Sequence, residues 1–158
     1  MLKSVTDAAM TLADQLGLLL QRRLRTGLHK EIVAGVHPAI TPATYPIISG
    51  IARTGAMTAA ALGHEIGIDR SLASRTAAAL VDAGLLEPTH DPTDRRATLL
   101  RLTASGAEVV DTLRGNLATA INDRLQEWSE HERQEFAELF GRFVADLTGP
   151  DESDGASA

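Results

Sequence analysis

The sequence predicts a mainly α-helical fold that contains one small β-hairpin. Aromatic residues make up 3% of the 158 residues, whereas alanine is abundant, and helices tolerate this mixture better than strands do. Apolar residues recur every three or four positions along most of the chain, which is the helical period. One stretch, residues 85–102, instead alternates on either side of a turn-forming segment, which is typical of a hairpin.

The composition fits a soluble globular protein, with 44% apolar and 23% charged residues. The absence of cysteine excludes a disulfide framework, a thiolate nucleophile and a cysteine zinc site. No run reaches the ~18 apolar residues of a membrane span. Asp7 and Asp14 interrupt the apolar N-terminal stretch, so we expect no signal peptide, no membrane partner and a cytoplasmic location.

The formal net charge of −6 is unevenly distributed. Residues 1–68 carry six basic and four acidic side chains, and residues 69–102 carry five of each. Residues 103–158 carry four basic and twelve acidic side chains. The overall charge is unusual for a nucleic-acid-binding protein, but the first two thirds of the chain remain open to an anionic partner.

The N-terminal segment is predicted to form one helix that begins near Val5 and ends before Gly27. Arginines at residues 22–25 suit the negative end of a helix dipole. A short helical piece is expected around Lys30–Ala34. The apolar face of the first helix has three- and four-residue spacing and comprises Val5, Ala9, Leu12, Leu16 and Leu19.

Three helices are predicted to follow. Thr41-Pro42 is a start signal for a helix that runs to about Arg53, with a bend at Pro46. Thr58 then caps a helix over residues 59–66, and a short turn leads to another over residues 71–83. Two short helices joined by such a turn form either a helix-turn-helix or an ordinary αα-hairpin. This pattern alone favours the ordinary αα-hairpin.

A β-hairpin is predicted directly after these helices. Residues 85–90 and 98–102 are the strands, and Asp91-Pro-Thr-Asp94 is rich in turn formers. The tip, residues 94–96, reads Asp-Arg-Arg. A helix-turn-helix followed by a hairpin with a basic tip is a winged helix.

Two helices are predicted to complete the fold. Thr103 caps a long helix, and Ser129 and Glu132 form a capping box that begins the last one. Residues 149–158 are small and acidic, and we expect them to be disordered. The apolar stripe of the long helix comprises Val110, Leu113, Leu117, Ile121, Leu125 and Trp128. That of the last helix comprises Phe136, Leu139, Phe140, Phe143, Val144 and Leu147.

The order of these elements and the segment 91–106, DPTDRRATLLRLTASG, resemble the MarR family of winged-helix transcription regulators. The segments 40–45 and 80–86 are also similar to that family. The resemblance covers roughly residues 5–147. It implies a winged helix-turn-helix domain over residues 36–103 and a helical dimerisation region over residues 1–28 and 104–148. The side chains expected to form the dimer are Leu12, Leu16, Leu125, Trp128, Phe136, Phe140 and Phe143.

The resemblance further implies a sequence-specific regulator, expected to be a repressor, that binds double-stranded DNA as a homodimer on a pseudo-palindromic operator. With Leu72 and Leu80 facing inward, the second helix of the helix-turn-helix would present its polar residues to DNA. Arg96 matches the arginine that the family inserts into the minor groove, Asp94 the acid that orients it, and Arg95 would meet phosphate. The expected DNA-binding residues are Arg70, Ser71, Ser74, Arg75, Arg95 and Arg96.

Three residues depart from the family's pattern. Ala78 and Ala79 stand where an acid and an arginine are common, and Pro88 stands where arginine is common. These departures weaken the binding expected to the phosphates of DNA.

The resemblance also implies a small phenolic or other anionic effector that binds between the dimer helices and the winged domain. No cofactor is expected. No catalytic motif is present, so we expect no enzyme.

Two alternatives stay open. One is a dimeric helical adaptor that has lost DNA binding, which the acidic isoelectric point of about 5.3 favours. The other is a metal-responsive regulator that uses His29, Glu31 and His37, although their spacing matches no zinc signature.

Overall fold

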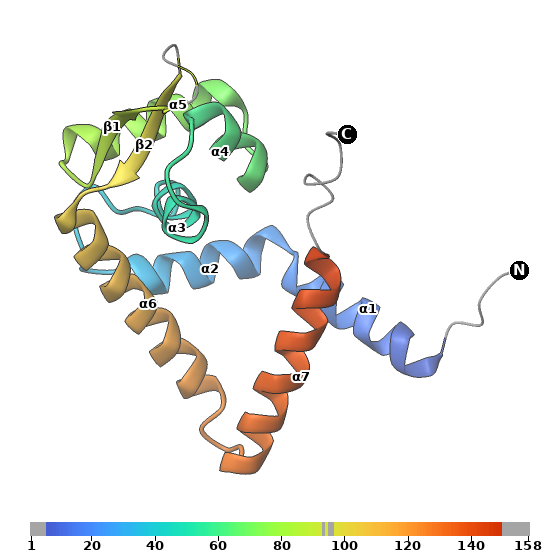
Figure 1. The fold of residues 1–158 in the computed structure, drawn as a ribbon. Helices are drawn as coiled ribbons and strands as arrows, with labels where there is room; N and C mark the ends of the chain where they lie inside the picture. Colours follow the sequence, from blue (N-terminus) through green and yellow to red (C-terminus); the bar gives the residue numbers. More distant parts are fainter. Residues whose placement is uncertain (1–5, 93, 95–96, 150–158) are drawn as a thin grey trace, which may run out of the picture. The chain divides into compact units, whose positions relative to one another are not determined.

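The computed structural model describes residues 6–92, 94 and 97–149 and confirms the mainly α-helical fold with one small hairpin (Figure 1). The chain divides into two compact units, residues 1–118 and 119–158. The elements of the first unit, in chain order, are α1 (Asp7–Leu19), α2 (Arg22–Val33), α3 (Tyr45–Thr54), α4 (Ala59–Ile66), α5 (Arg70–Asp82), β1 (Leu86–His90) and β2 (Thr98–Leu102). Helix α6 (Ala104–Arg124) spans the boundary, and α7 (Glu130–Thr148) lies in the second unit.

The N-terminal segment forms two helices and not the single one predicted. Helix α1 ends at Leu19, Gln21 has extended backbone with ψ of 132°, and α2 begins at Arg22. The arginines of residues 22–25 therefore lie in the first turn of α2, at the positive end of its dipole, and not at the C-terminal end of a helix as predicted. Gly27 lies inside α2, which continues through the predicted short piece to Val33.

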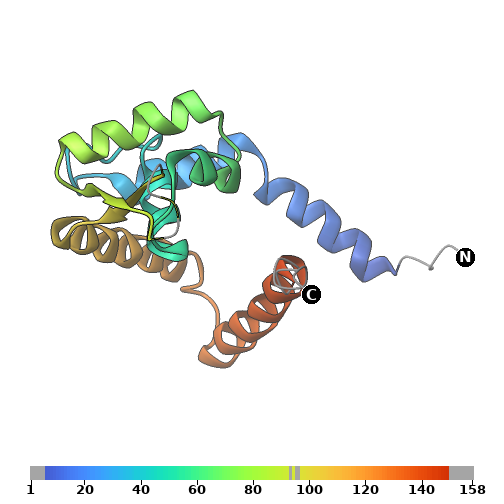
Figure 2. The same cartoon turned by 45° about the horizontal axis from the view of Figure 1, so that its top comes forward.

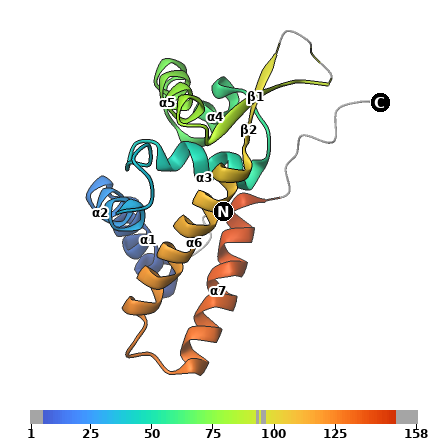
Figure 3. The same cartoon turned by 90° about the vertical axis from the view of Figure 1, so that its left-hand side faces the viewer.

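The core of the first unit is built from every element between α2 and α6. Ile32 of α2, Ile48 of α3, Leu62 of α4 and Leu80 of α5 are each at most 1% exposed. Leu86 of β1 belongs to the same cluster. In Figures 1 and 3, α3 lies between α2 and the pair formed by α4 and α5. The end of α2 thus supports the helices that follow it.

Helix α3 begins at Tyr45, three residues later than the Thr41-Pro42 signal predicted. The Thr44 hydroxyl accepts a hydrogen bond from the Thr41 amide and donates one to the Ala39 carbonyl, both at 2.8 Å, which orders the segment before the helix. Pro46 falls in the first turn, where its missing N–H has no intrahelical partner to lose. The predicted bend at Pro46 is therefore wrong.

The two strands pair in antiparallel register, with Leu86 opposite Leu102 and Pro88 opposite Leu100. Figure 3 shows the strands side by side and the end of β2 leading into α6. The Thr103 hydroxyl donates to the Gly84 carbonyl at 2.7 Å and accepts from the Gly106 amide at 3.0 Å. Thr103 therefore caps α6, as predicted, and ties it to the start of the hairpin.

Candidate nucleic-acid interface

A helix-turn-helix is formed by α4 and α5. The Thr58 hydroxyl accepts from the Ala61 amide at 3.1 Å and starts α4 where the sequence predicted. Gly67 ends α4 with φ of 71°, a left-handed conformation that favours glycine. Asp69 then caps α5, because its Oδ1 accepts from the Leu72 amide at 2.9 Å. The turn between the helices is thus fixed at both ends.

The buried stripe of α5 consists of Ala73, Ala77 and Leu80, each at most 2% exposed. Their spacing of four and three residues is one helical face. Leu72 was predicted to face inward with Leu80, and this is wrong, because Leu72 is 40% exposed. A sequence signal could have corrected this prediction. The small residues Ala73 and Ala77 are spaced four apart on one helical face, and such a face lets α5 approach α4 closely.

The opposite side of α5 is open. Figure 2 shows no other helix or strand of the described residues 6–118 covering it. The four residues of α5 that were predicted to contact DNA are all exposed there or beside it: Arg70, Ser71, Ser74 and Arg75. Ser71 and Arg75, four residues apart, lie farthest from the buried stripe, so they project most directly outward.

The hairpin is anchored beside this helix pair. Met57, just before α4, pairs with Leu100 of β2 through two backbone hydrogen bonds of 3.2 and 2.8 Å. On the exposed face of the hairpin, Glu87 and Arg101 form a salt bridge of 2.7 Å. The hairpin is therefore held to the loop between α3 and α4 as well as to α6.

The predicted basic tip of the hairpin is only partly described. The Asp94 amide donates to Asp91 Oδ1 at 3.3 Å, and the Ala97 amide donates to the Asp94 carbonyl at 3.0 Å. Arg95 and Arg96 lie outside the described residues, so their predicted contacts and the orienting role of Asp94 stay predictions. Residues 150–158 of the predicted acidic tail lie outside as well.

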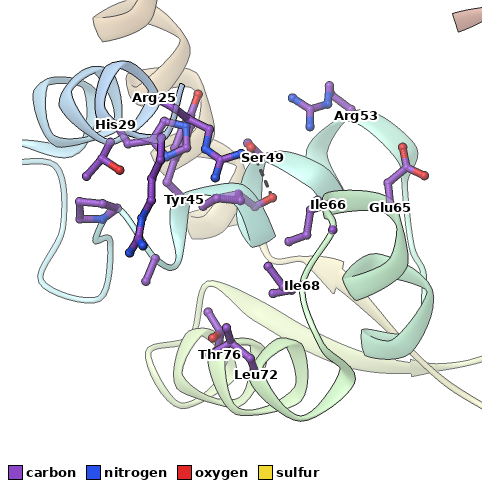
Figure 4. A pocket seen from close by; sticks show the side chains of 16 residues that line it. Arg25, His29, Tyr45, Ser49, Arg53, Glu65, Ile66, Ile68, Leu72 and Thr76 are labelled. Atoms are coloured by element: carbon purple, nitrogen blue, oxygen red, sulfur yellow. Dashed lines mark hydrogen bonds between the residues drawn. The ribbon is translucent and has the colours of Figure 1, made fainter. Parts of the chain in front are cut away.

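An open pocket of about 620 Å³ lies between α2, α3 and the start of α5 (Figure 4). Arg22, Arg25 and His29 line it from α2, and Arg53 lines it from α3. One acidic side chain, Glu65, also lines it. The apolar part of the lining comprises Tyr45, Ile66, Ile68 and Leu72 together with Pro42, Ala43 and Pro46. Three guanidinium groups against one carboxylate make the pocket electrically positive.

His29 and Tyr45 pack edge to face in this pocket, with ring centroids 4.8 Å apart. Burial lowers the pKa of His29, and the neighbouring Arg25 lowers it further, while a hydrogen bond with the Pro42 backbone acts in the opposite direction. Burial raises the pKa of Tyr45, and Arg53 opposes that shift. Both rings are therefore favoured in their neutral forms at neutral pH.

The residues predicted to form the dimer expose apolar surface within this single chain. Leu12 of α1 is 56% exposed, and no residue of α7 is buried. Trp128 packs edge to face on Phe136, which stacks on Phe140, with centroid distances of 5.3 and 5.7 Å. Leu16, Leu125 and Phe143 are half-buried. The capping box predicted at Ser129 and Glu132 is confirmed.

The three residues of the metal alternative do not form a metal cluster. Among the described residues, no group of three or more His, Cys, Asp or Glu side chains is placed to hold an ion. His29 contacts Tyr45, and His37 Nδ1 accepts a hydrogen bond from the Ala39 amide at 3.1 Å.

The helix pair and the first strand of the hairpin match a known family. Residues 40–97, which hold α3, α4, α5 and β1, match the sequence model of the MarR family. This segment is similar to the winged helix-turn-helix of the MarR family. The resemblance stated from the sequence is confirmed. A search of curated proteins finds no match.

Solved structures, MarR from E. coli among them, share the fold over most of the chain. Wild-type MarR from E. coli, in its apo form, is 18% identical, with a TM-score of 0.69, and the match covers 85% of this chain and 97% of that one. RV1404 from Mycobacterium tuberculosis is 23% identical, with a TM-score of 0.64 and coverage of 91% and 96%. The PcaV transcriptional regulator from Streptomyces coelicolor, solved with its natural ligand, is 25% identical, with a TM-score of 0.54 and coverage of 94% and 99%.

The chain therefore has the fold of a MarR-family transcription regulator. Within the described part of the chain, no helix is both long enough and apolar enough to cross a membrane.

Proposed function

We propose that this protein is a homodimeric transcription regulator that binds a pseudo-palindromic DNA operator. The observation that carries the proposal is the open side of α5, which presents Ser71 and Arg75 opposite the buried stripe of a MarR-family helix-turn-helix. In helix-turn-helix proteins, the second helix lies in the major groove and its N-terminal residues contact base edges. These two residues lie in the first two turns of α5.

The side chains on α5 have the chemistry of base readout. An arginine donates two parallel hydrogen bonds to a guanine edge, and a serine hydroxyl bonds to bases or phosphates. We assign base contact to Arg75 and Ser71, and contact with bases or the backbone to Arg70 and Ser74. Arg95 and Arg96 of the hairpin tip are proposed to reach phosphate and the minor groove, with Asp94 orienting Arg96.

The homodimer is proposed to be held by the exposed apolar residues of α1, of α7 and of the segment between α6 and α7. Leu12, Leu139 and Leu147 are each more than half exposed, and the aromatic side chains of Trp128, Phe136 and Phe140 are 41–45% exposed. Apolar surface of this extent is rare on a monomeric soluble protein and marks an interface. A two-fold dimer would place two copies of α5 in successive major grooves, so that the half-sites are ~10 base pairs apart.

The pocket beside α5 is proposed to take a small-molecule effector that releases the DNA. Arg22, Arg25 and Arg53 suit an anion, and the apolar walls suit an aromatic ring, so an aromatic carboxylate fits best. The solved PcaV regulator contains its natural ligand. A ligand acts by binding better to the conformation that cannot match the operator. We therefore propose repression that is relieved by ligand, and no enzymatic step.

The DNA part of the proposal is tested by binding measurements. Sequencing the DNA that the protein binds in the cell identifies a site, and a gel shift at low salt measures the affinity of the purified protein for it. Arg75→Ala should weaken binding by about 1–3 kcal/mol. The matched control is Arg142→Ala on the polar side of α7, which should bind as the wild type does. Equal binding by wild type and Arg75→Ala contradicts the assignment, and an adaptor that has lost DNA binding would show no specific site.

The dimer and the effector need separate tests. Sedimentation at micromolar concentration should give twice the mass of 16.8 kDa, and Phe140→Asp should give a monomer. A monomeric wild type contradicts the proposed dimer.

The effector is tested on the protein–DNA complex. Among aromatic carboxylates added to this complex, at least one should release the DNA. Arg25→Ala should keep DNA binding and lose this response, and a response unchanged in Arg25→Ala contradicts the pocket assignment.

A further inference from the structure

The exposure of Leu72 is a consequence of how α5 begins. The cap formed by Asp69 fixes the start of the helix, and the close contact of α5 with α4 is made by small residues. A Cβ placed on Gly63 of α4 would lie 3.0 Å from the Cβ of Ala73. This close approach turns the face of Ala73, Ala77 and Leu80 inward and leaves Leu72 with 40% of its surface exposed.

Leu72 is the one large apolar side chain that α5 exposes, and the structure describes every residue of that helix. It is the third residue of α5, next to Ser71 and one turn before Arg75. The exposed positions one turn or more beyond Arg75 are Ala78, Ala79 and, at the end of α5, Asp82. The short side chains of Ala78 and Ala79 allow a surface to approach the middle of α5 closely, and Leu72 projects beyond them.

We propose that Leu72 is a specificity-determining residue that contacts the 5-methyl group of a thymine in the major groove. This inference rests on the proposed DNA-binding function. The N-terminal residues of such a helix contact base edges, and of the four bases thymine alone presents a methyl group there, which apolar side chains contact. Arg75 would select a guanine by hydrogen bonds, and Leu72 selects a thymine by removing its methyl group from water.

A different role for Leu72 makes a different prediction. Leu72 also lines the pocket beside α5, together with Thr76. If Leu72 serves only as a wall of that pocket, its truncation changes the response to an effector and leaves the preference for thymine unchanged. Thr76→Ala, which alters the same wall one turn further along, is therefore the matched control.

The test uses operator duplexes in which each thymine is replaced by uracil, one position at a time. Uracil lacks the methyl group but keeps the hydrogen-bonding groups of thymine. Wild type and Thr76→Ala should bind about fourfold more weakly when the contacted methyl group in one half-site is removed, as expected for one buried carbon. Leu72→Ala should bind the thymine and uracil duplexes with equal affinity at that position.

Two results would overturn the inference. One is a wild-type protein whose affinity is unchanged by every uracil replacement. This result does not depend on whether any variant folds. The other is a Leu72→Ala protein that loses affinity at the same positions and by the same factor as the wild type. Failure of the wild type to bind any specific duplex would instead overturn the proposed function, so the two failures are distinguishable.

Discussion

The Asn116 side chain donates a hydrogen bond from Nδ2 to the backbone carbonyl oxygen of Ile32 at 2.8 Å. Asn116 lies in the middle of α6, and Ile32 is one residue from the end of α2, where carbonyl oxygens lack intrahelical partners. Ile32 itself is 1% exposed. The bond therefore satisfies a carbonyl at a buried helix end and joins α2 to α6.

Asn116→Ala should lower the free energy of unfolding by about 1–3 kcal/mol, because it leaves the Ile32 carbonyl oxygen without its partner. Urea denaturation at one fixed protein concentration measures this, since the stability of the proposed dimer would depend on concentration. Thr119→Ala, a change at an exposed position of the same helix, should stay within about 0.5 kcal/mol of the wild type. Equal losses in the two variants would show that the bond to Ile32 contributes nothing.

Gly106 and Gly115 of α6 should respond to alanine in opposite directions. A Cβ on Gly106 would overlap the backbone carbonyl oxygen of Leu85, whereas a Cβ on Gly115 meets no atom within 4 Å. Gly106→Ala should therefore destabilise the protein by about 1–3 kcal/mol or more, the cost of forcing extra atoms into packed structure. Gly115→Ala should stabilise it by about 0.5–1 kcal/mol through helix propensity. Thermal unfolding of both variants checks the pair.

The capping box of α7 should make stability depend on acidic pH. Hydrogen bonds from the Ser129 side chain and backbone lower the pKa of Glu132 below its ordinary value of 4.5. A carboxylate whose pKa is lowered by folding contributes stability above its unfolded pKa and loses that contribution as pH falls through its folded pKa. Ser129→Ala should thus destabilise the protein at neutral pH, and the difference from wild type should shrink below pH 4.5.

Urea denaturation of Ser129→Ala at a series of pH values measures this difference. Ser105→Ala, an exposed serine in the first turn of α6, is the control and should show no such pH dependence. A penalty for Ser129→Ala that is constant from neutral to acidic pH would exclude Glu132 as the titrating partner.

The salt bridge between Glu87 and Arg101 should contribute little to stability. Both side chains are well exposed, at 43% and 59%, so solvent and salt screen the charges. A double-mutant cycle of Glu87→Ala and Arg101→Ala should give a coupling free energy below about 1 kcal/mol, smaller still at high salt. A coupling well above that value would mean that the pair is held more rigidly than its exposure implies.

The elements with strong local signals could be predicted from the sequence. Thr58, Thr103 and Ser129 each start a helix because a hydroxyl group satisfies free amides of the first turn, and this interaction spans only three residues. The hairpin was predictable for a similar reason, since Asp91 and Pro92 favour a turn and the strands alternate. The outward direction of Arg75 followed from the helical period.

The remaining features depend on contacts that no local pattern encodes. The helix break at Gln21 involves neither glycine nor proline, and no side chain caps the start of α2. Leu72 was misplaced because hydrophobicity alone favours leucine over alanine as the buried residue. The close approach of α4 reverses that preference, since only Ala73 fits against Gly63. The pocket combines residues of α2 with residues of α3, α4 and α5, which the sequence separates.

The attachment of the hairpin at Met57 and Leu100 bears on how this protein could diverge from its relatives. Both bonds join backbone groups, and every amino acid except proline supplies the same donor and acceptor. The attachment therefore places almost no demand on which residues occupy the strand. Substitutions can accumulate at the exposed positions of the hairpin while its position stays constant, so the DNA contacts proposed for it can change without a change of fold.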